Sequence, residues 1–248
     1  FAQQVNVHGN REIKGVLTAN IVVNENVLKE DGVPNTGTFR AWTPIGNYSK
    51  QYTGAFDGNG KTVSGLYVNE DTNYVGLFGY VGDGGKVQYV GIIASYFNAY
   101  DNVGGVAGCI DEHSTVENCH NTSSVSGNYG VGGVVGSNSS GYSMVNNCYN
   151  TGTVTGNYKS VGGIVGVNYG TITNCYNTGT VTGNYNIGGV VGFNGKYGKV
   201  NNCYNTGTVT GNYDVGGVVG YNSKTNTVTN SYNTGSVSGN YNVGGVAG

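Results

Sequence analysis

The sequence has few charged residues, only two prolines and no long apolar segment. Charged residues make up 10% of the 248 residues, against about 25% in ordinary soluble domains. The net charge of −2 leaves no basic surface for nucleic acid. No apolar run approaches the ~18 residues that a membrane-spanning helix requires, and the 47 glycines lack the Gly-X-Y period of collagen. Composition therefore excludes these three classes, and the 21 regularly spaced tyrosines argue against disorder.

Charge is scarcest in the second half of the chain. Between Asn118 and Gly248 the only acidic residue is Asp214, and the basic residues are Lys159, Lys196, Lys199 and Lys224. The surface of this half must consist mainly of Asn, Thr, Ser, Gly and Tyr, which is typical of secreted bacterial modules. We therefore expect an extracellular location, on a bacterial cell surface or as a secreted product. Because the chain starts at Phe1 and stops inside a repeat, we also expect further repeats or domains in the full-length product.

What is present is an internal repeat of about 28 residues. A glycine-rich hexamer of the type VGGVVG begins at Val75, Val103, Val131, Val161, Ile187, Val215 and Val243. A second block of the type NCYNTGTVTG recurs between the hexamers. Each repeat contains three short β-like stretches separated by turn signals and cannot bury a core alone. The pattern predicts an all-β protein, a right-handed parallel β-helix (β-solenoid) with three short strands per coil and about seven coils.

The first part of the chain breaks this pattern. It contains both arginines and the only tryptophan, Trp42. We expect residues 1–41 to form an N-terminal cap that covers the exposed strand edges of a solenoid occupying residues 42–248. The segment FDGNGKTVSGL, which begins at Phe56, resembles an early coil in which Val63 and Gly65 match the Val and Asn of later repeats.

Two polar residue types recur once per coil and predict ladders along the solenoid axis. Stacked equivalents are one strand spacing apart, too far for disulfide geometry, so the cysteines are expected to be free, buried and stacked. The asparagines that follow the inward Val or Ile by two residues are expected to point inward and to bond along the axis. These structural ladders are Cys119, Cys148, Cys175 and Cys203, and Asn118, Asn147, Asn174, Asn202 and Asn230.

Tyrosine and threonine also recur, and each allows a second interpretation. The tyrosines at 149, 176, 204 and 232, and those at 129, 158, 185, 213 and 241, form either structural stacks or an aromatic stripe for glycan or peptide binding. The threonine pairs beginning at Thr153, Thr180 and Thr208 should point outward, and such a flat array is also the geometry of ice-binding solenoids. Serines at both ends of this threonine row weaken the ice-binding alternative.

Differences between repeats concentrate in the turn that follows each hexamer. Its length and composition change from coil to coil, whereas the other blocks are nearly constant. A ligand should therefore contact this variable edge. The candidate edge residues are Ser137, Tyr142, Tyr169, Phe193, Tyr197 and Tyr221.

The recurring pattern VGG[VI]VGxN followed by [VI]xNCYNTGxVxG resembles the GLUG-motif repeats of bacterial surface proteins. Such repeats also occur as accessory regions of some immunoglobulin A1 metalloproteases. The stretch from Trp42 through FDGNGKTVSGL is similar to the lead-in of such arrays in adhesin-like proteins. The resemblance covers roughly residues 42–248 and implies a β-solenoid exposed on, or released from, a bacterium.

The sequence predicts no catalytic, cofactor or metal site. Polysaccharide-active β-helices need clustered carboxylates or a calcium constellation, and the repeats contain almost no acids. His8, His113 and His120 have no partners at triad-like spacing. We therefore expect a non-enzymatic stalk or adhesin segment. The alternatives are a glycan- or host-protein-binding module and, more remotely, an ice-binding solenoid or a polysaccharide-active enzyme.

Overall fold

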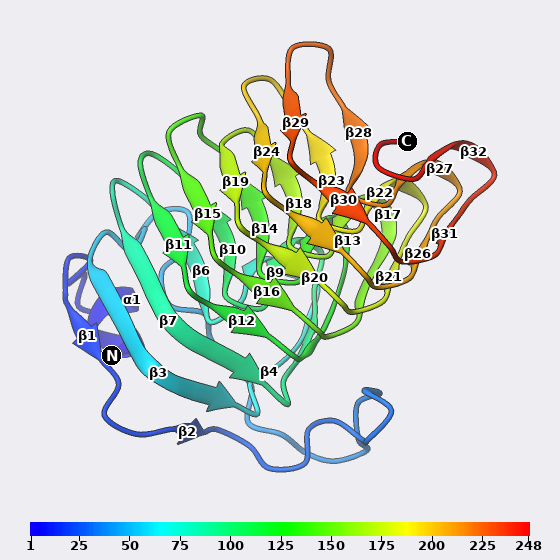
Figure 1. The fold of residues 1–248 in the computed structure, drawn as a ribbon. Helices are drawn as coiled ribbons and strands as arrows, with labels where there is room; N and C mark the ends of the chain where they lie inside the picture. The colour runs from blue at the N-terminus through cyan, green and yellow to red at the C-terminus, as the bar shows by residue number, and fades with distance from the viewer.

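The computed structural model describes all residues 1–248 and shows a parallel β-solenoid of about seven coils (Figure 1). The predicted fold is thereby confirmed. Every strand pair is parallel, and each coil pairs with the equivalent residues of the coils before and after it. One short helix, α1 (Ala2–Asn6), lies at the N-terminal end. It is far too short to cross a bilayer.

Three sheets run along the solenoid. The first contains β1 (Gly15–Val16), β2 (Ile21–Val22), β3 (Ala55–Ser64), β7 (Lys86–Ile93), β11 (Thr115–Glu117), β12 (His120–Asn121), β15 (Met144–Asn146), β16 (Tyr149–Asn150), β19 (Thr171–Thr173), β20 (Tyr176–Asn177), β24 (Lys199–Asn201), β25 (Tyr204–Asn205), β29 (Thr227–Thr229) and β30 (Tyr232–Asn233). The second contains β6 (Phe78–Val81), β10 (Ala107–Ile110), β14 (Val135–Asn138), β18 (Val165–Asn168), β23 (Val191–Asn194) and β28 (Val219–Asn222).

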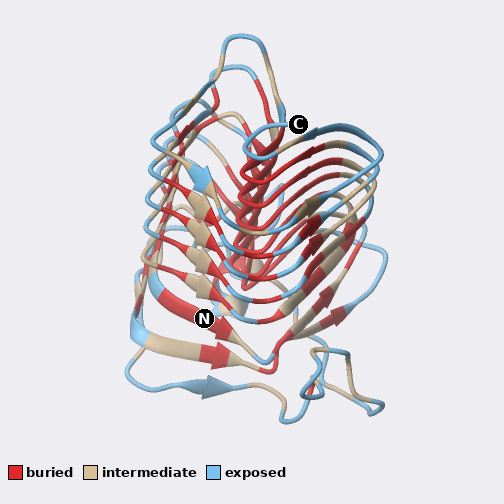
Figure 2. Cartoon of the chain, turned by 45° about the vertical axis from the view of Figure 1, so that its right-hand side comes forward, coloured by how far each residue is buried: buried red, intermediate tan, exposed pale blue.

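The third sheet contains β4 (Tyr67–Asn69), β5 (Asn73–Val75), β8 (Tyr96–Asn98), β9 (Asp101–Gly104), β13 (Ser124–Gly132), β17 (Val154–Gly162), β21 (Val181–Thr182), β22 (Tyr185–Gly188), β26 (Val209–Thr210), β27 (Tyr213–Gly216), β31 (Val237–Ser238) and β32 (Tyr241–Gly244). In Figure 2 the second sheet lies between the other two and is coloured almost entirely as buried. Within each coil the chain passes through the first sheet, then the third sheet and then the second sheet, as in the order β7, β8, β9 and β10.

The core consists of apolar side chains stacked in register. Val116 pairs with Val145, Val145 with Ile172, and Ile172 with Val200, and all four are fully buried. Since β-branched residues suit a strand surface covered by neighbours, one residue type repeated at 28-residue intervals builds a continuous core. The alternation of buried valine and exposed threonine continues along the third sheet, where Val154, Val181 and Val209 are also fully buried.

Glycine allows the second and third sheets to pack closely. A Cβ atom on Gly166 of β18 would lie 2.5 Å from the carbonyl carbon of Gly130 and 2.5 Å from the backbone nitrogen of Val131. Both partners belong to β13 in the preceding coil, so the contact joins two backbones rather than two side chains. The glycine-rich hexamer is therefore required by this backbone approach.

The N-terminal segment covers the first coil. Val5 of helix α1 is fully buried in the core, and strands β1 and β2 pair with the outer edge of β3. Ile45 and Tyr52 bridge to the edge of β6, and the indole nitrogen of Trp42 donates to the carbonyl oxygen of Gly76 at 3.1 Å. Backbone groups of the first-coil strands are thereby paired, as edge protection requires.

The alignment of the first coil differs from the sequence-based expectation. Phe56, not Val63, pairs with Val87 and so occupies the position of the inward valine. Val63 pairs with Ile92, which aligns with Asn121. The reason is that β3 has two more residues than β7 at this place: Asp57 pairs with Gln88 and Lys61 pairs with Val90, and the register shifts between these two pairs.

Candidate functional site

The cysteine ladder lies on the inner side of the first sheet. Cys119, Cys148, Cys175 and Cys203 are free and fully buried. The Sγ of Cys175 donates to the carbonyl oxygen of Thr173 at 3.2 Å and accepts the backbone N–H of Cys148 at 3.5 Å. In the last coil the hydroxyl of Ser231 replaces the thiol and accepts the N–H of Cys203 at 3.1 Å. Each thiol thus satisfies backbone groups of two successive coils.

The thiols are placed for packing rather than for nucleophilic chemistry. Burial raises the pKa of the Cys148 thiol well above its ordinary value. Cys109 is outside the ladder, in β10, and burial raises its pKa to about 11 although Ser139 lies 3.2 Å from its Sγ. A reactive cysteine needs a lowered pKa and access to solvent. All five thiols are buried and lack that access to solvent.

We expect Cys175→Ser to leave the stability of the fold nearly unchanged and Cys175→Ala to lower it by about 1–3 kcal/mol. Serine keeps an acceptor for the N–H of Cys148, as Ser231 does naturally for Cys203, whereas alanine leaves that buried donor unpaired. Urea unfolding followed by circular dichroism measures both variants. Equal stability of the serine and alanine variants would show that the thiol only fills space.

The asparagines expected to point inward point outward instead. Asn118, Asn147, Asn174, Asn202 and Asn230 have φ between 49° and 55°, and all but Asn118 are exposed. Asparagine tolerates this left-handed conformation, which kinks the strand and turns the following cysteine into the core. Their amides still bond along the axis, as when the Nδ2 of Asn202 donates to the Oδ1 of Asn174 at 3.3 Å.

A different asparagine ladder is buried, and sequence reasoning missed it. The Nδ2 of Asn150 donates to the Oδ1 of Asn177, and the Nδ2 of Asn177 donates to the Oδ1 of Asn205, both at 2.8 Å. A second hydrogen of Asn177 Nδ2 reaches the carbonyl oxygen of Gly179 at 2.8 Å. The sequence does contain a signal for this ladder, because an asparagine recurs two residues after each ladder cysteine and after Ser231. Buried ladder members are Asn121, Asn150, Asn177, Asn205, and, in a second row, Asn138, Asn168 and Asn194.

The tyrosine ladder presents ring edges. His120, Tyr149, Tyr176, Tyr204 and Tyr232 stack with centroids 4.8 to 5.2 Å apart and planes inclined by 3 to 6°. Since each ring between the two ends of the row is covered on both faces by its neighbours, these rings present only edges and hydroxyls to solvent, and Tyr232, at the C-terminal end, stacks on one face alone. A sugar ring needs an open aromatic face, so this stripe does not provide a stacking platform.

The second tyrosine set is less regular than the sequence suggested. Tyr185, Tyr213 and Tyr241 stack at 4.8 and 4.7 Å. Tyr158 is one residue out of register, because Lys159 pairs with both Tyr129 and Tyr185. The coil that contains Tyr158 is therefore the place where this row is interrupted.

The threonine rows lie on the outer face of the third sheet. Thr155, Thr182 and Thr210 pair in register, with Ser126 and Ser238 at the two ends of the row. Their side chains alternate with fully buried valines. This outward placement is compatible with both interpretations of the threonine row, as an ordinary exposed strand face and as an ice-binding face.

The variable turns form one edge of the solenoid, between the second and first sheets. Tyr142 and Tyr197 are 75% and 64% exposed and line one cavity of about 510 Å³. Tyr169 contacts Phe193 edge-on at 6.2 Å, and Phe193 stacks on Tyr221 at 5.5 Å. Ser137 differs from the other candidate residues because it is buried and lies 2.9 Å from the hydroxyl of Ser139.

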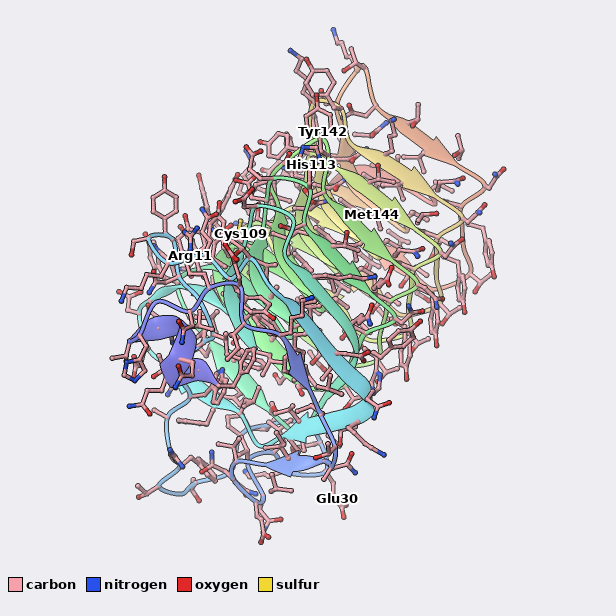
Figure 3. All side chains as sticks on the ribbon, turned by 90° about the vertical axis from the view of Figure 1, so that its left-hand side faces the viewer. Arg11, Glu30, Cys109, His113, Tyr142 and Met144 are labelled. Atoms are coloured by element: carbon pink, nitrogen blue, oxygen red, sulfur yellow. The ribbon has the colours of Figure 1, made fainter.

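Figure 3 shows Tyr142 and His113 together at this edge, and Met144 on the neighbouring face of the first sheet. The two rings stack at 4.8 Å with planes inclined by 20°. The hydroxyl of Tyr80 donates to the Oδ2 of Asp111 at 3.1 Å, but no group of three or more His, Cys, Asp and Glu residues is arranged to hold a metal ion. The variable edge is the surface on which the structure gathers open aromatic faces.

Comparisons with known proteins give the same repeat assignment. A family description of the GLUG motif matches residues 127–155, 157–182 and 183–210. A protein of Evansella cellulosilytica described as a "Putative Gly-rich membrane protein" is 38% identical over 56 residues, which cover 22% of this chain and 6% of that protein. The match therefore spans a small fraction of the relative's length.

A solved structure shares the fold. It is described as a "putative immunoglobulin A1 protease" from Bacteroides ovatus, and it superposes with a TM-score of 0.73 at 22% identity. The superposition covers 92% of this chain and 71% of that chain. At this identity the likeness supports the β-solenoid fold and carries no statement about activity.

Proposed function

Because residues 127–210 are GLUG-motif repeats, we propose that this chain is a non-catalytic spacer segment of a bacterial surface or secreted protein. Its role is to hold other parts of that protein, or its own variable edge, away from the cell. The observation that carries the proposal is the uniformity of the coils. The valine, cysteine and asparagine ladders continue in register through successive coils, so each coil packs on the next in the same way.

Uniform packing suits a spacer because coils can be added or removed without changing how the remaining coils contact one another. In a solenoid each coil contacts only its neighbours, and adding one coil adds about 4.8 Å. Seven coils give a rod of roughly 34 Å. A catalytic site would instead require one coil with a distinct set of acids or bases, and Asp214 is the only acid beyond Asn118.

Surface composition supports an extracellular location. The outer rows consist of Thr, Ser, Asn and Tyr, with one ion pair in the whole chain, between Lys86 and Glu117 at 2.7 Å. The relative from Evansella cellulosilytica is described as a membrane protein, which agrees with attachment at a bacterial surface. Adhesion to a glycan or a host protein would be a further property of the variable edge.

Coil insertion tests the spacer proposal. Four additional copies of residues 172–199, placed after Lys199, should lengthen the rod by about 19 Å and leave the fold unchanged. Small-angle X-ray scattering measures the maximum dimension, and circular dichroism measures the β content. A chain that collapses or aggregates on insertion, while the parent chain remains folded, would contradict neighbour-only packing.

Absence of catalysis is tested separately. The purified chain should release no product from polysaccharides or from immunoglobulin A in the presence of calcium or zinc. A matched sample of denatured chain provides the background rate. Turnover above this background that disappears on a single substitution would overturn the non-catalytic assignment.

A further inference from the structure

The cavity at the variable edge arises from unequal turn lengths. Between β18 and β19 the chain needs only Tyr169 and Gly170, whereas the turns before and after are longer. The two longer turns come close to each other beside the short one, because a Cβ atom placed on Gly141 would lie 3.8 Å from the Cβ of Tyr197. The resulting cavity of about 510 Å³ is lined by Gly141, Tyr142, Tyr197, Gly198, Lys199, Thr225 and Thr227. This volume lies in the range of small-molecule sites.

Two tyrosines at the cavity have open ring faces, unlike the tyrosines of the ladders. Tyr142 is stacked on His113 on one side only and is 75% exposed. Tyr197 has the Nζ of Lys196 at 4.8 Å from its ring centroid and is 64% exposed. Open aromatic faces are the surfaces on which the apolar C–H face of a pyranose ring packs, and threonine hydroxyls can bond the sugar hydroxyls.

Tyr197 is held in an unfavourable backbone conformation. Its φ is 75°, in the left-handed region that a bulky side chain disfavours and that glycine adopts without strain. Gly195 and Gly198 lie in the same turn, one before and one after Tyr197. Glycine is therefore present in this turn but not at position 197, where it would relieve the strain. Strain of this kind concentrates at binding and active sites.

Positive charge gathers at the same edge. Three of the four lysines beyond Asn118 lie in or beside these turns: Lys196 and Lys224 in the turns, and Lys199 at the start of β24. Asp214 lies in β27 of the third sheet, on another part of the coil. The nearest turn acids are Asp111 and Glu112, in the turn that carries His113 on the far side of Tyr142. The lining of the cavity therefore combines two tyrosine rings, two threonine hydroxyls and one ammonium group, that of Lys199, and it contains no carboxylate.

We infer that this cavity binds an anionic saccharide, with the Tyr142 and Tyr197 rings packing on sugar rings and Lys199 pairing with a carboxylate or sulfate. Thr225 and Thr227 supply hydroxyls for the sugar's own hydroxyl groups. Single-stranded nucleic acid also combines bases for stacking with negative charge, but it requires a basic groove along the backbone. Here the chain as a whole carries a net charge of −2 and neither arginine lies beyond residue 40. The inference goes beyond the spacer role and does not depend on it.

Binding is measured by affinity electrophoresis and calorimetry with two pairs of polymers. Polygalacturonate is compared with its fully methyl-esterified form, and dextran sulfate with dextran. The chain should bind at least one anionic polymer and should bind its neutral counterpart at least tenfold more weakly. Lys199→Met should weaken binding about tenfold, as expected for loss of a charged contact.

Tyr197→Gly is the sharpest variant, because it removes the ring and also relieves the strained φ, so it should fold at least as well as the parent. We expect it to weaken binding at least tenfold. Removing Gly195 and Lys196 shortens the turn to the pattern of Val167–Thr171 and should abolish binding while the fold is retained. Tyr158→Ala and Lys159→Met, which alter an exposed tyrosine and a lysine of β17, are the matched controls and should bind like the parent.

Four results would overturn the inference. These are absence of binding to both anionic polymers at millimolar sugar concentration, equal binding of the neutral polymers, retained binding in Tyr197→Gly, and tighter binding of oligo(dT) than of either polymer. Each leaves the spacer proposal intact, because that proposal is tested by rod length and not by affinity.

Discussion

Asn177→Asp should destabilise the solenoid by about 3–5 kcal/mol at neutral pH, the range for an uncompensated buried charge. Asn177 is fully buried, and its Nδ2 donates to Asn205 Oδ1 and to the carbonyl oxygen of Gly179, both at 2.8 Å. Aspartate cannot make either donation, and its carboxylate would face two oxygens without a nearby cation. Urea unfolding at pH 7 measures the loss.

The pH dependence of this variant has a definite sign. Burial and the facing oxygens raise the pKa of the introduced carboxyl above its unfolded value of about 3.9. The destabilisation is therefore small at pH 3, where the acid is protonated in both states, and grows as the pH rises above about 4. Asn174→Asp, at an exposed asparagine of the same coil, is the matched control and should change stability by less than about 0.5 kcal/mol. Equal effects at the two positions would contradict the buried ladder.

Gly166→Ala should cost about 3 kcal/mol or more, at the upper end of overpacking effects. The added Cβ would lie 2.5 Å from the Gly130 carbonyl carbon, 2.5 Å from the Val131 nitrogen and 2.7 Å from the Gly136 oxygen. All three atoms belong to the backbone, two in β13 of the third sheet and one in β14 of the second sheet, so the clash can be relieved only by moving backbone strands apart. Thermal unfolding by calorimetry measures the expected loss.

The control for this variant is Gly141→Ala, because a Cβ there meets nothing closer than 3.8 Å. Neither glycine has a positive φ, so the two substitutions differ in steric contact and not in backbone conformation. We expect Gly141→Ala to be neutral or slightly stabilising, since it reduces the conformational freedom of the unfolded chain. A Gly166→Ala variant as stable as the control would mean that the two sheets are less closely packed than described.

The coil, its length and the inward valines could be predicted from the sequence because a 28-residue repeat leaves few ways to bury a core. The sequence could not predict which of Asn118 and Asn121 is the buried asparagine. Both recur in every coil, and simple alternation from Val116 places Asn118 inward. The left-handed backbone at Asn118 interrupts that alternation, so that Cys119 and Asn121 point inward instead.

The variable edge was located correctly in the chain, but its cavity depends on relations between coils. Sequence alone shows that the turn at Tyr169 is short. It does not show that Tyr142 and Tyr197, 55 residues apart, then lie at one cavity. In the same way, Ser137 precedes the variable turn in the sequence but is a buried residue of β14, which pairs with the neighbouring coils through Cys109 and Val167.

The buried asparagines give the rod an electrical direction. In both rows every Nδ2 donates toward the C-terminal coil, from Asn121 to Asn150 and onward to Asn233, and from Asn138 to Asn168 and onward to Asn222. Amide dipoles aligned head to tail polarise one another, so each bond is strengthened by those before and after it. An interior asparagine should therefore contribute more stability than one in a terminal coil.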